Sequence, residues 1–426
     1  GLVQHPLYLH LTAVTFSLLL FNMKSIIASS LLVSSTMSAE LKTAQNGKAI
    51  ASQYIIRMNP DQTVTGLRAH IKEMQSRLGR EMETTSVYEA LGNLFLGYSA
   101  RLTPRALEAL ISDPRLMYIE EDQVVSLNAC NQESNPDWGL ARVGNANYTA
   151  AGTWTYPYPD GGSGAGVNAY IIDTGIYCEN NDFVNKNVGT CTFGESFVYS
   201  GFGPNKVKDT TDGNGHGTHC AGSVAGQTYG IAKEANLIAV KVLSDSGSGS
   251  TSGVIDGINW VASDATAKAK PSVANLSLGG GFSQANNDAV SALVAAGVTT
   301  AVAAGNDNAD ACDYSPASTP AAITVAASDK TNARASYSNY GSCVDVYGPG
   351  SAITSAWIGS PSATNTISGT SMASPHVAGV AANVLSRNPG STPAQITANI
   401  IANSVSDQIT GNKVNTPNLM VQSNCN

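Results

Sequence analysis

The sequence contains few charged residues, and beyond residue 33 it has no apolar run long enough to span a membrane. Charged side chains make up 13% of the 426 residues, and Lys and Arg together number 23. Because so few cations leave little for a nucleic-acid footprint, we expect no nucleic-acid partner. The net charge is −8, and the 12 basic and 20 acidic residues from Ala129 onward account for all of it. This acidic balance favours solubility and disfavours the binding of polyanions.

The length favours two folded units preceded by a targeting sequence. Residues 1–22 are interpreted as a translated leader. Residues 23–39 are interpreted as a signal peptide with one lysine, a short apolar core and small residues for cleavage. Removal of this signal would leave a secreted, extracellular protein without a membrane segment. The alternative is one membrane anchor from Leu7 to Val33, which Asn22, Lys24 and several serines interrupt.

Residues 49–128 are predicted to form a separate small unit with elements in the order β-α-β-β-α-β, which is typical of a ferredoxin-like α+β domain. The unit contains no cysteine and no catalytic constellation. Its acidic run at 120–122 is interpreted as a solvated edge, with a metal site as the alternative. The pattern predicts strands at 54–58 and 95–100, helices at 64–78 and 103–112, and an extended segment at 124–127.

From Ala129 onward, apolar segments of strand length alternate with helical patterns. Strands are predicted at 167–173, 236–243, 273–279, 298–304 and 322–327, and helices near 216–226, 252–267, 284–296, 371–386 and 392–402. This alternation predicts an α/β fold with a parallel sheet and helices on both faces. Functional residues of such sheets lie at the carboxyl ends of strands and at the start of helices.

Ser371 stands at a position that suits a nucleophile. It belongs to the glycine-led segment 369–376, which opens an alanine-rich stretch that is predicted to form a buried helix. The first N–H groups of a helix are unpaired, and the helix dipole favours negative charge beside them. A hydroxyl alone is a poor nucleophile, so it needs a base and an acid that orients the base.

Candidates for the base and for the orienting acid lie upstream of Ser371. His216 stands among glycines just before a predicted small-residue helix, with His219 as the alternative base three residues later. Asp173 ends the apolar strand predicted at 167–173. The order Asp, His, Ser is that of subtilisin and differs from the two other known orders of this triad.

These segments closely resemble the subtilisin superfamily, and in particular its proteinase K-like branch. Asn306 matches the asparagine that donates to the oxyanion in this family. The resemblance implies a serine endopeptidase with Asp173, His216 and Ser371 as catalytic triad and an acyl-enzyme as intermediate. It also implies a parallel-sheet sandwich of the subtilisin type over residues 129–426. The alternative is a non-catalytic relative that serves as a binding module.

The resemblance also assigns a substrate cleft. Two segments would hold the substrate backbone as an added strand, and a first specificity pocket would lie beside them. The residues concerned are Ser277, Leu278, Gly279, Gly247, Ser248 and Gly249 for the backbone, with Ala304 and Gly305 added for the pocket. The segments 277–279 and 303–305 contain no acidic residue, so we expect a broad or apolar preference rather than one for Arg or Lys. The alternative for the Gly/Ser run at 244–249 is an ordinary flexible loop.

Seven cysteines after a signal-like start indicate disulfides formed in an oxidising compartment. By its resemblance to the proteinase K-like enzymes, Cys220 matches a free, buried cysteine of that branch. Cys312 and Cys343 match a disulfide-bonded pair of its aqualysin-like members. The remaining four cysteines have no such match. Their pairing stays open, with Cys178 and Cys191 as local partners and Cys130 and Cys425 as a tie between the two ends of the region.

Calcium is expected from the resemblance alone, and no catalytic cofactor is implied. Pro320 and Ala322 match two backbone carbonyl ligands of a family calcium site, and Asp345 matches its carboxylate ligand. A ligand set made only of oxygen atoms suits this ion. Without the resemblance, Asp345 would be interpreted as an ordinary strand residue.

Residues 49–128 resemble the propeptide of subtilisin-like zymogens, which acts as an intramolecular inhibitor. Alignment with the processing site of the proteinase K-like enzymes predicts a cut after Asn128, so that the mature chain begins at Ala129. The expected partners are therefore protein and peptide substrates and the chain's own propeptide. The mature enzyme is expected to be a monomer.

Overall fold

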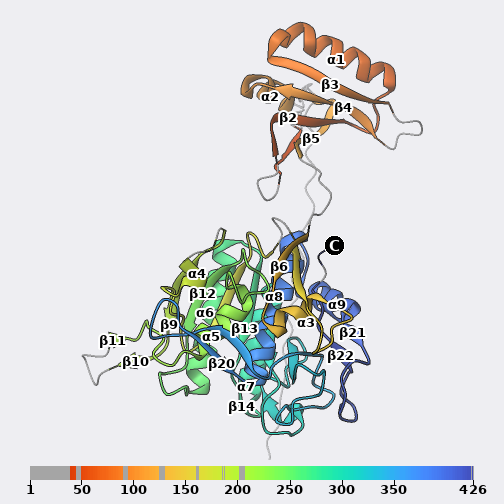
Figure 1. Ribbon diagram of the computed structural model, residues 1–426. Coiled ribbons are helices and arrows are strands. Elements are labelled where there is room, and N and C mark those ends of the chain that lie inside the picture. The colour runs from red at the N-terminus through yellow and green to blue at the C-terminus, as the bar shows by residue number, and fades with distance from the viewer. Residues whose placement is uncertain are drawn as a thin grey trace, which may run out of the picture. The chain divides into compact units, whose positions relative to one another are not determined.

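The computed structural model describes residues 39–44, 49–89, 95–123, 130–159, 163–184, 186, 188–200, 207–423 and 425. The chain divides into two compact units, Gly1–Val124 and Val125–Asn426, and both are drawn in Figure 1. The predicted leader, the predicted signal peptide up to residue 38, the extended segment predicted at 124–127 and the predicted processing position at Asn128 lie outside the described residues. The described helices include none that is both long and apolar enough to cross a membrane.

The first unit is a five-stranded sheet with two helices. The strand order is β1-β5-β2-β4-β3, and along the chain β2 to β5 follow the predicted order β-α-β-β-α-β. Both helices start at a threonine whose side chain accepts a backbone N–H of the first turn, Thr63 for α1 and Thr103 for α2. The elements are β1 (Glu40–Lys42), β2 (Ala49–Met58), α1 (Val64–Leu78), β3 (Met82–Glu89), β4 (Leu96–Leu102), α2 (Pro104–Ile111) and β5 (Leu116–Gln123).

The second unit is built on a nine-stranded sheet with the order β21-β22-β18-β17-β15-β13-β8-β12-β9. Neighbouring strands run parallel, except for the antiparallel edge pair β21 and β22. The strands are β8 (Asn168–Asp173), β9 (Cys191–Ser196), β12 (Asn236–Lys241), β13 (Ser272–Leu276), β15 (Thr299–Ala303), β17 (Ile323–Ser328), β18 (Val346–Pro349), β21 (Val405–Ser406) and β22 (Leu419–Met420).

Helices cover both faces of this sheet, as predicted. Residues of α5 (His216–Ala225), α8 (Thr370–Arg387) and α9 (Pro393–Asn403) join one core cluster, and residues of α6 (Thr251–Lys268) and α7 (Gln284–Ala295) join another. Strand β8 alternates between them, since Ala169 and Ile171 belong to the first cluster and Tyr170 and Ile172 to the second. Because both faces are covered, every residue of β8 is buried, as expected for a central parallel strand.

Shorter elements surround the sheet. They are β6 (Cys130–Ser134), α3 (Trp138–Gly144), β7 (Thr155–Pro159), α4 (Asn181–Val184), β10 (Tyr199–Ser200), β11 (Val207–Lys208), β14 (Gly280–Gly281), β16 (Tyr314–Ser315), β19 (Ile353–Ala356) and β20 (Thr364–Ile367), with 3₁₀ turns at Gly79–Glu81 and Ala311–Asp313.

Three disulfides hold loops and ends of the second unit. Cys130 is bonded to Cys425, Cys178 to Cys191 and Cys312 to Cys343, with Cα atoms 5.9, 5.5 and 5.3 Å apart. Cys220 is free and buried. The first bridge spans 295 positions of sequence, so it closes a large loop in the unfolded chain and lowers the conformational entropy of that chain.

Candidate active site

Asp173 and His216 meet at the carboxyl edge of the nine-stranded sheet. Asp173 is the last residue of β8 and is fully buried, whereas His216 is the first residue of α5. Nδ1 of His216 lies 2.8 Å from Oδ1 of Asp173, and the backbone N–H of Thr174 donates to the same oxygen at 2.7 Å. The carboxylate therefore orients the imidazole and fixes the nitrogen that carries the proton.

The turn before α5 requires glycine. Gly215 caps the helix with φ at 101°, a conformation that residues with a Cβ rarely adopt. A Cβ atom at this position would also approach the indole ring of Trp357 to 2.6 Å. The Asp212 carboxylate closes the same turn by accepting the backbone N–H groups of Gly215 and Thr218. This local sequence directs His216 to the sheet edge.

Two opposing effects act on the protonation of His216. Burial alone lowers the pKa of its imidazole, but the charge of Asp173 and the hydrogen bond to it outweigh burial and raise the pKa well above its ordinary value. The Sγ atom of Cys220 lies 4.0 Å from Nδ1 of His216. Cys220 adds to the rise in the His216 pKa, and burial raises the pKa of the Cys220 thiol itself.

Ser371 lies in the first turn of α8, which begins at Thr370 and contains Pro375. Proline has no N–H, so the Ser371 carbonyl, four residues earlier, receives no helical hydrogen bond from it. Two side chains donate to this carbonyl instead, Oγ of Ser277 at 2.7 Å and Sγ of Cys220 at 3.4 Å. The proline thus creates an acceptor through which the helix start is fixed to the end of β13.

The Ser371 hydroxyl donates to the backbone carbonyl of Ser277 at 3.2 Å. Between Ser371 and His216, both of which the structure describes, no side-chain hydrogen bond is formed. Catalytic hydrogen bonds of free enzymes commonly tighten only when substrate is bound. Asn275 links the end of β13 to α8 a second time. Its side-chain Nδ2 donates to Oγ of Ser277 at 2.9 Å, and its Oδ1 accepts a hydrogen bond from the Ser374 hydroxyl at 2.8 Å.

Asn306 follows β15 and presents an amide nitrogen beside the start of α8. Its Oδ1 atom accepts the backbone N–H of Thr370 at 2.8 Å and the Thr370 hydroxyl at 3.1 Å. With the oxygen engaged, Nδ2 of Asn306 donates to none of the residues that the structure describes. The N–H of Ser371, in the first helical turn, has no acceptor within the helix. Two donors are therefore available for an oxyanion.

His219, the alternative base, lies in the core. It is fully buried, and its Nε2 atom lies 3.0 Å from the carbonyl of Ile353. Burial lowers the pKa of His219 to about 4. The side chain is therefore a neutral core group, and the imidazole that contacts Asp173 belongs to His216.

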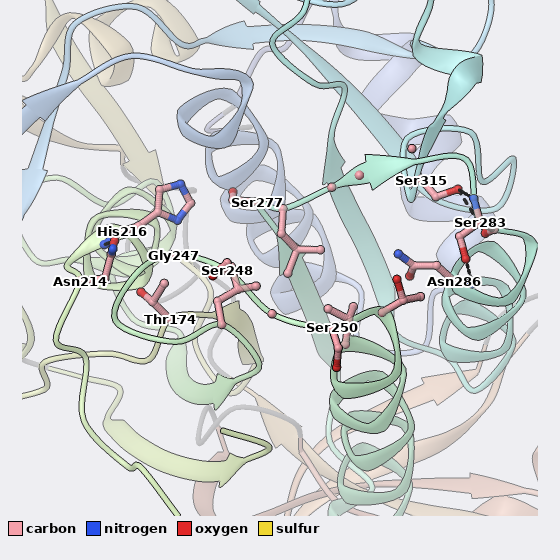
Figure 2. A pocket seen from close by; sticks show the side chains of 18 residues that line it. Thr174, Asn214, His216, Gly247, Ser248, Ser250, Ser277, Ser283, Asn286 and Ser315 are labelled. Carbon is pink, nitrogen blue, oxygen red and sulfur yellow. Dashed lines mark hydrogen bonds between the residues drawn. The ribbon is translucent and has the colours of Figure 1, made fainter. Parts of the chain in front are cut away.

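Two adjoining cavities, each of about 440 Å³, form a cleft beside these residues. In the first cavity, His216 and the segment 247–251 face the segment 277–281 (Figure 2). The second cavity contains Asn306 and Ser371 and shares residues 278–281 with the first. All eight residues expected to bind substrate line one cavity or the other: Ser277, Leu278, Gly279, Gly247, Ser248, Gly249, Ala304 and Gly305.

Comparison with known proteins assigns both units. Residues 164–420 match the sequence profile of the Subtilase family, and residues 53–128 match that of Peptidase inhibitor I9. The chain belongs to the subtilase family. It is a serine endopeptidase that carries an N-terminal unit of the inhibitor type.

Similar proteins cover most of this subtilase. A cuticle-degrading serine protease of Arthrobotrys oligospora is 44% identical over 382 residues, which are 87% of this chain and 90% of the relative. The alkaline serine exoprotease A of Vibrio alginolyticus is 42% identical over 382 residues, covering 88% of this chain and 68% of the relative. A crystal structure of a cold adapted subtilisin-like serine proteinase superposes with a TM-score of 0.61 at 44% identity, over 68% of this chain and 99% of the other.

The second cavity of this subtilase includes a carboxylate that was not among the predicted residues. Asp307 and Tyr314 both line it. The prediction of a pocket without acid rested on the segments 277–279 and 303–305 alone. The position of Asp307 directly after Asn306 was the sequence signal that could have found it.

The predicted calcium ligands lie around the start of β17. Oδ2 of Asp345 accepts the backbone N–H of Thr324 at 2.8 Å, and its Oδ1 atom has no hydrogen-bond partner among the described residues. Burial raises the pKa of Asp345 to about 6, so the ionised carboxylate is costly at this position. This carboxylate is hydrogen-bonded to the start of β17, and Pro320 and Ala322 lie just before that strand, so the three residues fit an ion that prefers oxygen ligands.

Proposed function

We propose that this subtilase hydrolyses peptide bonds through a triad of Asp173, His216 and Ser371. The proposal is supported above all by the 2.8 Å contact between Nδ1 of His216 and Oδ1 of Asp173, at a cleft that His216 and Ser371 both line. Before reaction, the Ser371 hydroxyl has to turn from the carbonyl of Ser277 toward Nε2 of His216.

In the reaction, Oγ of Ser371 attacks the carbonyl carbon of the substrate while His216 takes the hydroxyl proton. Asp173 stabilises the imidazolium that results. The oxyanion accepts hydrogen bonds from Nδ2 of Asn306 and the N–H of Ser371. His216 then protonates the departing amine as the peptide C–N bond breaks, and water hydrolyses the acyl-enzyme to release the acid and restore Ser371.

The first specificity pocket is proposed to accept apolar side chains and to be broad rather than exclusive. Leu278, Ala303 and Ala304 supply an apolar wall, and Gly305 lines the same cavity. The carboxylate of Asp307 on the same cavity adds a partner for the cation of a long basic side chain. An apolar preference with tolerance for Lys and Arg follows from this combination.

Calcium is proposed as a structural ion of this enzyme. The carboxylate of Asp345 and the carbonyl oxygens of Pro320 and Ala322 would hold it, and it would neutralise a buried charge. None of these groups takes part in the bond-breaking steps, so the ion would act on stability alone.

The enzyme is further proposed to be a secreted, extracellular monomer made as an autoprocessed zymogen. The inhibitor-type unit over residues 53–128 supports the zymogen, and three disulfides support an oxidising compartment. Protein and peptide substrates and the chain's own inhibitor unit are its partners, with no nucleic acid and no membrane after signal removal.

Labelling with a fluorophosphonate tests the catalytic proposal, because this probe reacts with a serine only when the serine is activated. Wild type should be labelled on Ser371 and Ser371→Ala should not. Peptide hydrolysis should fall on the order of a millionfold, as known for the equivalent serine of subtilisin. Ser368→Ala, at an exposed serine three residues away, is the matched control that should keep labelling. A folded wild type that is neither labelled nor active would favour the binding module.

A further inference from the structure

Two consecutive asparagines on α7 differ in the hydrogen bonds that their side chains form. Asn286 and Asn287 are equally buried, each with 6% of its surface exposed. The Asn287 amide donates to Oγ of Ser318 at 2.8 Å and accepts the hydroxyl of Thr319 at 3.0 Å. The Asn286 amide makes no hydrogen bond to any residue that the structure describes, and its Oδ1 atom is buried. Asn287 is thus part of the core, whereas Asn286 lacks a partner.

The unpartnered amide of Asn286 belongs to the first cavity of the cleft. In Figure 2 Asn286 and Ser250 lie on the side of this cavity that is opposite to His216 and Asn214. The backbone of Asn286 is fixed, because its N–H donates to Oγ of Ser283, which caps α7. A fixed backbone holds the amide at the far end of the cleft, away from the reacting bond.

The surroundings define what such an amide could bind. Leu243, Val254 and Leu278 line the same cavity, so an apolar residue would fit this position without the cost of burying an unpaired carboxamide. Apart from His216, no residue that lines this cavity in the described part of the chain carries an ionisable side chain. A charged ligand group would find no counter-ion here, whereas a neutral group with a donor and an acceptor would pair with the amide in either of its orientations.

We propose that Asn286 selects substrates whose side chain at this end of the cleft is neutral and hydrogen-bonding, namely Asn, Gln, Ser or Thr. This inference rests on the proposed role of the cleft in binding the substrate backbone. The substrate side chain replaces the hydrogen bonds that the Asn286 amide lacks, while its stem packs on the leucines and the valine. Asn286 is a specificity-determining residue and takes no part in bond breaking.

Internally quenched peptides that contain either Asn or Leu at one position at a time, on both sides of the cleaved bond, test the proposal. The two side chains have similar size, so the comparison sets hydrogen bonding against apolar burial at constant volume. Wild type should favour Asn over Leu in kcat/KM by about three- to tenfold at one position remote from the cleaved bond, the range that one neutral hydrogen bond supplies. Preferences at the other positions should not depend on residue 286.

Two variants separate specificity from folding. Asn286→Leu should abolish the preference for Asn, and Gln284→Leu, at an exposed residue of the same helix turn, is the matched control that should retain it. Asn286→Asp keeps the size of the side chain and suits the third residue of a helix. It should favour Lys over Leu at the same substrate position by about threefold or more, which a merely structural role would not produce.

A wild type that favours Leu at every remote position, or an Asn286→Leu variant that keeps the preference for Asn, would overturn the inference. If Asn286→Leu does not fold, the Asn286→Asp variant provides the test. A variant that does not prefer Lys over Leu at this substrate position would then count against the proposal. Hydrolysis of the whole peptide set by wild type but not by Ser371→Ala tests the proposed function independently, so a failure of the two ideas can be told apart.

Discussion

His216 must be neutral to take the proton from Ser371, yet its surroundings favour the charged form. Asp173 raises the pKa of the imidazole well above 6.5 in spite of burial. The same carboxylate that orients the base therefore restricts the pH range in which the base can work. This conflict is useful, because a high pKa also makes the imidazolium a stable product of the first proton transfer.

The acid limb of the pH profile should reflect this balance. Because only the neutral imidazole accepts a proton, kcat/KM should rise with pH through the pKa of His216, and the apparent pKa of that limb should exceed 6.5. The measurement is hydrolysis of a peptide without ionisable side chains, with enzyme shown to remain folded by circular dichroism at each pH. An acid limb centred at or below 6.5 would show that Asp173 does not dominate the titration.

Single residues were predictable from the sequence where a short motif determines them. The segments around Asp173, His216 and Ser371 carry their own glycines and helix starts, so the pairing of Asp173 with His216 could be expected. Asp307 and Asn286 were not predicted, because their surroundings come from segments that are distant in sequence. An amide that lacks a partner, as in Asn286, is visible only when every neighbour has been placed.

At the scale of elements, the long helices and the central strands of the second unit were predicted to within a few residues, whereas the strands β3, β5, β9 and β18 were not located. Helix α1 spans the predicted 64–78, and strand β8 starts one residue inside the predicted 167–173. Short elements such as β21 and β22 were not predicted, because two residues carry no periodicity. Their pairing at the sheet edge depends on tertiary contacts that only the folded chain supplies.

Asp345, at the end of the loop that joins β17 to β18, leads to a prediction about calcium. Without the ion, the carboxyl of Asp345 has a pKa of about 6 in the folded chain, above its usual value when unfolded. Its ionised form therefore costs stability above pH 6, and protonation relieves that cost as the pH falls. Calcium would offset the same cost only while the group is ionised, so calcium and protons compete.

Calcium should therefore raise the thermal midpoint of the Ser371→Ala protein at pH 8 and have little effect at pH 5. At a hundredfold excess over the dissociation constant, the gain is about 2.7 kcal/mol. The inactive background prevents autolysis during the scan. Asp345→Asn should show no response at either pH, whereas Asp329→Asn, at another loop aspartate, should respond like its parent. An Asp345→Asn protein whose midpoint follows calcium as its parent does would exclude this site.

At the scale of the whole molecule, the two units have separate cores and different tasks. The first unit contains no cysteine, whereas three bridges stabilise the second. Cys130 lies two residues after the predicted cut and is bonded to Cys425, and strand β6, which it begins, pairs with β7. The N-terminal end of the second unit is therefore anchored independently of the first. Removal of the first unit, as proposed for maturation, would leave this anchor intact.

Maturation tests this division of the chain. If the enzyme cuts itself after Asn128, the Ser371→Ala protein should accumulate as an uncut precursor when no other protease is present. The wild-type product should begin at Ala129, within about two residues, and keep 298 of the 426 residues. Because a first cut within the same molecule does not depend on encounter, its rate constant should stay unchanged over a hundredfold dilution. N-terminal sequencing and a dilution series measure both. Fully active enzyme in which residues 49–128 remain covalently attached would refute the zymogen, and processing of Ser371→Ala at the wild-type rate would refute self-cleavage.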